Sequence, residues 1–419
     1  MSEKHDRMSR RSFFKVMEAA GLSSVFASSA AKANPKEPNA PQKTQRPNFQ
    51  QVPRRKLGKT GVEIPCLALG CGFLNLLDNQ TILRSALKWG VNYWDTAYEY
   101  MGGNSELGIG KLLSKNPELR KKLFIVTKAS GAQSVEDVEE CLQTSLKRMN
   151  TNYIDLYYGV HGLSHPDLLT DELSKWAEDA KKRKLIRFFG FSTDQNMAEC
   201  LGRAAKLSFI DAVLTVYNFR LMQDPQLQTA VKECYDAGVG LVAMKVTGKT
   251  VLRDMRQKVG TQEDKQLVRP FIERGFTEEQ ANIKVVLEDK RFSSVCITMQ
   301  NPAVLTSNVA VALDKTKLTK ADMAAFTEYA RATCRGYCAG CSRICSAAVP
   351  EVPYISDIMR YLMYYNSYGE RDRAREFFAG IPSKTRSKLL RTDYNLAEAR
   401  CPQHLPIGKL VTEAVSKLA

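Results

Sequence analysis

Four residues of complementary chemistry follow one another at the ends of apolar segments. Asp95 and Tyr100 lie in VNYWDTAYEYMGGNSE (91–106), and Lys128 and His161 end the next two apolar segments. A free tyrosine, with a pKa of about 10, is a poor acid at neutral pH. A neighbouring ammonium lowers that pKa, and a carboxylate keeps the ammonium charged. With His161 bonded to a carbonyl oxygen, the set predicts protonation of that oxygen together with hydride delivery to its carbon, or the reverse reaction.

Each of these four residues also has a purely structural explanation. Asp95 could cap a helix, Tyr100 could pack a loop, Lys128 could be a solvated strand end, and His161 could be a satisfied structural histidine. Only the four residues occurring together therefore indicate catalysis. It requires a fold that brings the ends of consecutive apolar segments to one place.

A second group of reactive residues lies in the last quarter of the chain, where CRGYCAGCSRIC (334–345) has the spacing C-x3-C-x2-C-x3-C. Four thiolates converging from a glycine-containing loop suit an iron–sulfur cluster. Zinc and a pair of disulfides are the alternatives. The candidate metal ligands are Cys334, Cys338, Cys341, Cys345 and Cys401, the last of which precedes Pro402.

The elements that must position these residues are eight short apolar segments that alternate with longer amphipathic ones. Several are almost continuously apolar, as in strands buried on both faces of a parallel sheet. Eight strand–helix units over about 250 residues predict a closed (β/α)8 TIM barrel, an α/β fold. A doubly wound open sheet is disfavoured because no G-x-G-x-x-G turn follows the first strand. The expected strands are 65–70, 91–97, 123–128, 153–161, 186–192, 212–218, 239–245 and 293–299.

The barrel predicts where the chemistry takes place, because active sites of such barrels lie at the C-terminal ends of the strands. Polar residues stand at seven of these ends, from the second strand to the eighth. They are Asp95, Lys128, His161, Ser192, Asn218, Lys245 and Thr298.

The order of these motifs resembles the aldo-keto reductases. D-T-A-x-x-Y from Asp95 to Tyr100 is followed by N-S-E, V-T-K, D-L-Y…H-G and G-F-S. The resemblance covers about Arg55 to Ala312 and implies a (β/α)8 barrel that uses a nicotinamide cofactor, NADP(H) or NAD(H). It implies that Tyr100 is the general acid, that Lys128 and Asp95 tune it, and that His161 orients the substrate. The residues implied near the cofactor are Ser192, Asn218, Lys245, Thr298 and Asn308.

Two departures from the family pattern lead to further expectations. The spacing from Asp155 to His161 is one residue longer than usual, which predicts a bulge before His161. Residues 298–308 contain no Lys or Arg to bind a 2′-phosphate, so the choice between NADP(H) and NAD(H) stays open. The C-terminal region is similar to the ferredoxin-like domain of a subset of the family. This implies one [4Fe-4S] cluster, with either Cys334 or Cys401 as the fourth ligand.

The N-terminal residues resemble a twin-arginine signal. Arg10-Arg11 precedes a mildly apolar segment (16–31), and Ala31-Lys32-Ala33 offers a cleavage site. We therefore expect a signal peptide at 1–33, a flexible linker at 34–54, a barrel at 55–315 and a C-terminal helical iron–sulfur domain at 316–419. The twin-arginine machinery would place the protein in the periplasm with its cluster already built.

The net charge of +16 is scattered along the chain, and no nucleic-acid-binding module is recognised. No segment is apolar enough for a permanent membrane span. The sequence thus predicts an oxidoreductase that acts on a small carbonyl or alcohol, with a redox partner protein as a further candidate. The alternative is an exported iron–sulfur electron-transfer or binding protein that uses the barrel only as a scaffold.

Overall fold

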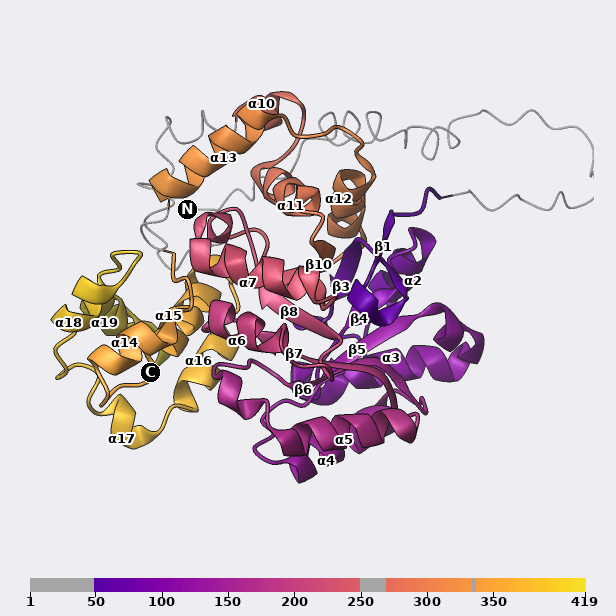
Figure 1. The fold of residues 1–419 in the computed structure, drawn as a ribbon, viewed down its shortest axis with the longest axis horizontal. Coiled ribbons are helices and arrows are strands. Elements are labelled where there is room, and N and C mark those ends of the chain that lie inside the picture. The colour runs from indigo at the N-terminus through magenta and orange to yellow at the C-terminus, as the bar shows by residue number, and fades with distance from the viewer. Residues whose placement is uncertain (1–48, 249–268, 334–336) are drawn as a thin grey trace, which may run out of the picture.

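The computed structural model describes residues 49–248, 269–333 and 337–419. The expected signal peptide, most of the linker and Cys334 lie outside these residues. Within them, eight parallel strands close into a barrel in the order β10-β3-β4-β5-β6-β7-β8-β9, which confirms the predicted fold class (Figure 1). The strands are β3 (Leu67–Gly70), β4 (Tyr93–Asp95), β5 (Phe124–Lys128), β6 (Ile154–Val160), β7 (Ile186–Thr193), β8 (Ala212–Val216), β9 (Gly240–Met244) and β10 (Phe292–Thr298).

The strands form where the sequence is almost continuously apolar because both of their faces are covered. Their inner faces fill the barrel with Tyr93, Phe124, Leu156, Tyr158 and other buried side chains, and their outer faces pack under the helices. The helices that surround the barrel are α2 (Thr81–Lys88), α3 (Asn104–Lys115), α4 (Val135–Arg148), α5 (Asp171–Lys182), α6 (Met197–Ala204), α7 (Pro225–Asp236), α11 (Glu278–Glu288) and α12 (Pro302–Leu313).

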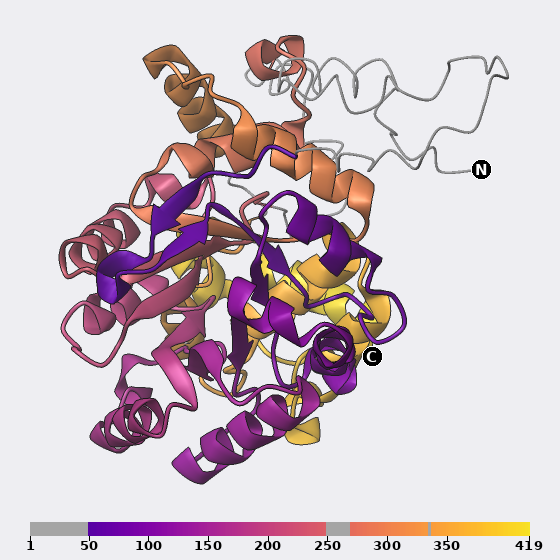
Figure 2. The same ribbon diagram turned by 90° about the vertical axis from the view of Figure 1, so that its right-hand side faces the viewer.

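The two ends of the barrel are covered differently. A hairpin of β1 (Arg54–Lys56) and β2 (Glu63–Pro65), which the sequence analysis missed, lies at the N-terminal ends of the strands. Figure 2 looks onto this hairpin, with the C-terminal helices behind the barrel. The opposite end, where the strands finish, is therefore the one that the C-terminal region covers.

The C-terminal region is helical and has a core of its own, in which Ile358, Leu362, Phe378, Leu410 and Val411 are buried. Ile355, Ile358, Met359, Leu362 and Met363 recur at helical spacing and are all buried on α15. The helices after the barrel are α13 (Lys320–Thr333), α14 (Ser342–Ala348), α15 (Ile355–Met363), α16 (Arg371–Ala379), α17 (Ser383–Arg386), α18 (Asn395–Arg400) and α19 (Ile407–Leu418).

The boundary between the barrel and the C-terminal domain stays a prediction. Phe326 of α13 meets Phe219 and Phe271 edge to face, and Tyr329 of α13 stacks on Phe219. Phe271 belongs to the short helix α10 (Arg269–Glu273) on the barrel side. The α13 helix therefore packs with the barrel rather than with the later helices. No helix in the described ranges combines the length and the apolarity needed to cross a bilayer.

Candidate active site

A cavity of about 1190 Å³ opens at the C-terminal ends of the strands. Asp95, Tyr100, Lys128 and His161 all line it, so the fold brings together the four residues that the sequence places at or just after three strand ends. The ends of consecutive strands thus lie in one place, as a joint role of these four residues in catalysis requires.

The loop that carries Tyr100 is held by buried polar contacts. The chain reverses through η3 (Tyr100–Gly103), where Gly103 has φ +92° and a Cβ atom would come within 2.7 Å of the Arg148 guanidinium. Glu106 of the N-S-E motif accepts bonds from Thr127 (2.6 Å) and Arg148 (3.1 Å), and Arg148 also donates to the Tyr98 carbonyl (2.7 Å). These contacts fix the loop on both sides of Tyr100.

Lys128 and Asp95 form a buried ion pair at the ends of β5 and β4. The Lys128 ammonium donates to Asp95 Oδ1 (2.5 Å) and to the Thr96 carbonyl (2.7 Å), and both side chains are almost fully buried. Burial by itself lowers the pKa of Lys128, but the charge of Asp95 outweighs it and the net pKa is raised. Lys128 is therefore held as an ammonium, as the sequence analysis expected.

Tyr100 packs against this ammonium, whose Nζ is 4.7 Å from the centre of the phenol ring. Burial raises the pKa of Tyr100 to about 12, while the charge of Lys128 and a hydrogen bond to it act in the opposite direction. The expectation of a lowered pKa is thus wrong for this structure, because desolvation of the phenolate outweighs the ammonium. Lys128 limits the rise but does not reverse it.

His161 follows β6 behind a register shift between Tyr158 and Val160, which is the predicted bulge. Its ring meets that of Tyr100 edge to face at 5.7 Å, and its Nδ1 bonds Ser130 Oγ at 2.7 Å. Burial, aided by the charge of Lys128, lowers the pKa of His161 to about 3. The imidazole is therefore neutral at physiological pH.

The residues predicted near the cofactor separate into two groups. Ser192, Lys245, Thr298 and Asn308 line the same cavity as Tyr100. Asn218 is fully buried, and its amide donates to the Tyr337 hydroxyl (2.9 Å) and accepts from the backbone of Arg220 (3.1 Å). Its amide is thus used within the protein, and Asn218 is not part of the cavity lining.

The C-terminal region contributes arginines to the same cavity, and sequence reasoning missed them: Arg343, Arg360 and Arg373 all line it. Arg360 of α15 makes two bonds of 2.6 Å to Asp194, which also pairs with Lys245 at 2.9 Å. Burial alone would raise the pKa of Asp194, but these two cations lower it well below its usual range. Arg373 of α16 donates to the Gly72 carbonyl (3.1 Å) and lies 5.6 Å from the Tyr100 ring centre.

Sequence reasoning also missed Ser130 and Glu99. Glu99 Oε1 lies 3.8 Å from both His161 Nδ1 and the Arg373 guanidinium. A signal was present, since Ser130 comes two residues after the end of β5 and Glu99 directly precedes Tyr100. The arginines gave no signal, because their place depends on how the C-terminal helices dock.

Four of the five candidate metal ligands converge, and the fifth, Cys334, lies outside the described residues. Cys338, Cys341, Cys345 and Cys401 line one small cavity between α14, α15 and the start of the CPQH segment. The side-chain oxygen of Gln403, buried and without a hydrogen-bond partner, belongs to a residue of the same lining. Burial, followed by the charges of the other cysteines, raises the pKa of the Cys341 thiol to about 12.

The described cysteines are all free thiols, so the disulfide alternative finds no bridge among them. The other six described cysteines are buried: Cys66, Cys71, Cys141, Cys200, Cys234 and Cys296. In the ranges that the structure describes, no group of three or more His, Cys, Asp or Glu side chains is arranged to hold a metal ion.

Comparison with known proteins agrees with this geometry. Residues 68–331 match the model of the aldo/keto reductase family. Probable aldo-keto reductase 1 of Glycine max is 30% identical over 219 residues, which are 48% of this chain and 60% of that protein. Aldo-keto reductase yakc of Schizosaccharomyces pombe, whose name includes NADP(+), is 30% identical over 224 residues, 48% of this chain and 63% of that protein.

The chain thus spans about three fifths of the length of these two curated relatives. Among solved structures, the thermostable aldo-keto reductase Tm1743 with the inhibitor epalrestat has a TM-score of 0.54 at 24% identity, covering 66% of this chain and all of that one. The holo form of aldo-keto reductase AKR11C1 from Bacillus halodurans also has a TM-score of 0.54, at 21% identity, over 67% of this chain and 97% of that one. These two structures share the barrel fold, and the family match shows that this chain belongs to the aldo/keto reductase family.

Proposed function

We propose that the protein is an oxidoreductase that transfers a hydride between a nicotinamide cofactor and the carbon of a small carbonyl or alcohol. The observation that carries the proposal is the joint placement of Tyr100, Lys128, Asp95 and His161 in one cavity at the strand ends. A phenol, an ammonium and a neutral imidazole around one cavity supply both a proton and a second donor for a carbonyl oxygen.

Tyr100 is the proton donor in reduction and the acceptor in oxidation. With a pKa of about 12 it stays protonated at neutral pH, which suits the donor role. As the proton leaves the phenol, the buried ammonium of Lys128 stabilises the developing phenolate without any need to reorient. Asp95 supports this step indirectly, because it keeps Lys128 charged in a buried environment.

His161 orients the carbonyl oxygen. Its Nδ1 is bonded to Ser130, which leaves Nε2 as the ring nitrogen for the substrate. When the Ser130 hydroxyl donates to Nδ1, Nε2 carries the hydrogen and can donate to the substrate oxygen. The low pKa of His161 fits this role, since a neutral imidazole donates a hydrogen bond without competing with Tyr100 as an acid.

The remaining cavity suits a dinucleotide. Its lining continues from Tyr100 past Ser192 and Lys245 to Thr298 and Asn308 on β10 and α12, so these four would hold the cofactor. NADP(H) or NAD(H) would supply the hydride. Asn218 is a weaker candidate than the sequence suggested, because Tyr337 and a turn occupy its amide.

The decisive experiment is nicotinamide-dependent carbonyl reduction by the purified full-length protein, followed at 340 nm with a panel of aldehydes and ketones. Tyr100→Phe should lower kcat by about 10²–10⁴-fold. Tyr98→Phe is the matched control, since Tyr98 is two residues away and does not line the cavity. Full activity in Tyr100→Phe would refute the proposal, and a silent barrel with a redox-active brown chromophore would favour the electron-transfer alternative.

We also propose that Cys338, Cys341, Cys345 and Cys401 hold an iron–sulfur cluster. Four thiols from two distant segments around one cavity are a suitable donor set, and bound iron would offset the repulsion between their thiolates. Zinc is the alternative occupant of the same four thiols. One tetrahedral ion with bonds of about 2.3 Å draws its sulfurs within about 4 Å of each other, whereas a four-iron cluster spaces them more widely.

Export by the twin-arginine route to the periplasm completes the proposal, with Arg10-Arg11 as its support. That route carries folded proteins, so a cluster and a cofactor could be bound before export. A redox partner protein would then exchange electrons with the cluster outside the cytoplasm.

A further inference from the structure

Asn196, in the turn between β7 and α6, joins three separate segments of the chain. Its backbone N–H donates to the Gly340 carbonyl (2.8 Å), and its side-chain amide donates to Ser342 Oγ (3.0 Å) and to the Ser164 carbonyl (2.7 Å). Its side-chain oxygen accepts from the Arg343 backbone N–H (3.2 Å). Asn196 is buried and left-handed (φ +47°), a conformation that asparagine tolerates better than most residues.

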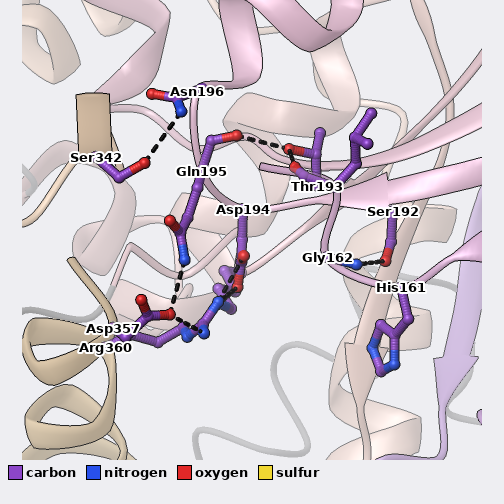
Figure 3. Close-up of polar contacts among 12 residues, drawn as sticks. His161, Gly162, Ser192, Thr193, Asp194, Gln195, Asn196, Ser342, Asp357 and Arg360 are labelled. Carbon is purple, nitrogen blue, oxygen red and sulfur yellow. Dashed lines mark hydrogen bonds and ion pairs between the residues drawn. The ribbon is translucent and has the colours of Figure 1, made fainter. Parts of the chain in front are cut away.

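One of these segments is the histidine loop (161–164), which begins at His161. The loop is bonded to the end of β7, since Gly162 N–H donates to Ser192 Oγ (3.0 Å) and Leu163 N–H to the Ser192 carbonyl (2.7 Å). The Asn196 amide holds its far end, at Ser164. Figure 3 shows His161, Gly162 and Ser192 on one side of this turn and Asn196 with Ser342 on the other.

Another segment is the cysteine loop (338–343), which carries two of the proposed cluster ligands, with a third just beyond it. It is pressed against the same turn, because a Cβ atom on Gly340 would come within 2.4 Å of the Asp194 carbonyl oxygen. Gln195 adds a bond of 2.8 Å to Asp357 of α15. All three consecutive residues of the turn, Asp194 to Asn196, are thus bonded to the C-terminal region.

The Asn196 amide suits this position better than any other side chain of its size. Both of its N–H groups and its oxygen are used, and they bond groups of two different loops. Aspartate offers no donor in place of the two N–H groups, and leucine offers neither donor nor acceptor. A displacement of the cysteine loop therefore reaches the Ser164 end of the histidine loop through one rigid, planar group.

We propose that Asn196 is a positioning residue that couples the cysteine loop to the substrate-orienting His161. The proposal rests on the role given above to His161, and it does not require Asn196 to touch the substrate. A consequence is that binding or loss of the proposed cluster at the cysteine site changes the position of the His161 ring.

The test compares Asn196→Gly with Asn150→Gly. Glycine keeps the left-handed backbone and removes only the side-chain bonds. Asn150 is the matched control because it is also left-handed (φ +49°), but it is exposed, and within the described residues its side chain bonds only Ser114. The readouts are the ring resonances of His161 in protein labelled at its four histidines, assigned with His161→Gln, and kcat and KM.

In Asn196→Gly we expect the His161 resonance to shift and kcat/KM to fall about ten- to hundredfold, since small misplacements of a substrate-positioning group have effects of that size. Asn150→Gly should change neither. A His161 resonance at its wild-type position in Asn196→Gly overturns the proposal. A shifted resonance in a protein that reduces no carbonyl removes the proposed function and leaves the coupling standing.

The consequence for the cysteine site has its own test. Cys401→Ser, which removes one proposed ligand, should shift the His161 resonance in the otherwise wild-type chain and add little in the Asn196→Gly background. Equal shifts in both backgrounds would show that the coupling bypasses Asn196. No shift in either would show that the cysteine site and His161 are independent.

Discussion

The buried pair of Asp95 and Lys128 leads to a quantitative prediction for Asp95→Asn. The substitution keeps the shape of the side chain but leaves the buried Lys128 ammonium without its counter-charge. Removing one partner of a buried ion pair costs about 3–5 kcal/mol of unfolding free energy. If the cost were larger, Lys128 would lose its proton in the folded state instead. Deprotonating a lysine with the ordinary pKa of about 10.4 costs about 1.4 kcal/mol for each pH unit below that pKa, and this cost is the upper limit of the penalty. At pH 7 that limit is about 4.6 kcal/mol, so the two values agree.

The protonation of Lys128 also sets the pH dependence of this loss of stability. In the wild type the pKa of Lys128 is raised, so the stability that the pair contributes is constant up to about pH 10.4 and is lost only above it. In Asp95→Asn, burial depresses the pKa of Lys128 below that of the unfolded chain. The unfolded state then binds more protons, and the stability of the variant rises with pH. The deficit should shrink from about 3–5 kcal/mol at pH 7 to about 2 kcal/mol at pH 9.

Urea unfolding at pH 7, 8 and 9, followed by tryptophan fluorescence, measures this deficit, since Trp94 is buried beside Asp95. The double variant Asp95→Asn/Lys128→Met is the control. It removes the stranded ammonium, so its deficit should not vary over this pH range. A loss below about 1 kcal/mol at pH 7 in the single variant, or a deficit that stays constant to pH 9, would refute the reasoning.

Three further predictions concern the reaction, the cluster and export. With Tyr100 protonated up to a pKa of about 12 and His161 neutral above about 3, kcat/KM for reduction should be constant from pH 6 to 9. Oxidation needs the phenolate, so kcat/KM for oxidation should rise about tenfold per pH unit over that range. A plateau below pH 9 would mean that burial does not control the pKa of Tyr100. Iron analysis and visible spectra of anaerobically purified protein should show loss of the cluster in Cys401→Ser and its retention in Cys334→Ser, and the opposite pattern would exchange the fourth ligand. The double variant Arg10→Lys/Arg11→Lys should remain in the cytoplasmic fraction, and unchanged export would exclude the twin-arginine route.

Local sequence was sufficient for much of the barrel and for naming the residues that the proposed proton transfer uses. Strands such as Phe124–Lys128 and Ile154–Val160 are mostly apolar on both faces, which is typical of a covered parallel sheet. The bulge before His161 followed from the family resemblance, because the spacing from Asp155 to His161 is one residue longer than the family pattern and the extra residue must be absorbed before the strand ends.

The balance of forces in the site did not follow from the residue types. The sequence places an amine near a phenol and so predicts a lowered pKa for Tyr100, but the depth of burial reverses the sign. Desolvation depends on every atom that covers the hydroxyl, including those of distant segments. For the same reason the sequence places Asn218 at a strand end but does not identify its hydrogen-bond partner, the hydroxyl of Tyr337.

By itself, the sequence determined the alternation of strands and helices and the polar residues at the strand ends, because both are set by neighbours a few positions apart. Only the tertiary structure decided that Arg360 and Arg373 reach the barrel cavity. It also decided that Cys401 lines the same small cavity as the cysteines of the cysteine loop. Those contacts depend on how two cores pack against each other, and pairing over such distances leaves no periodic trace in the chain.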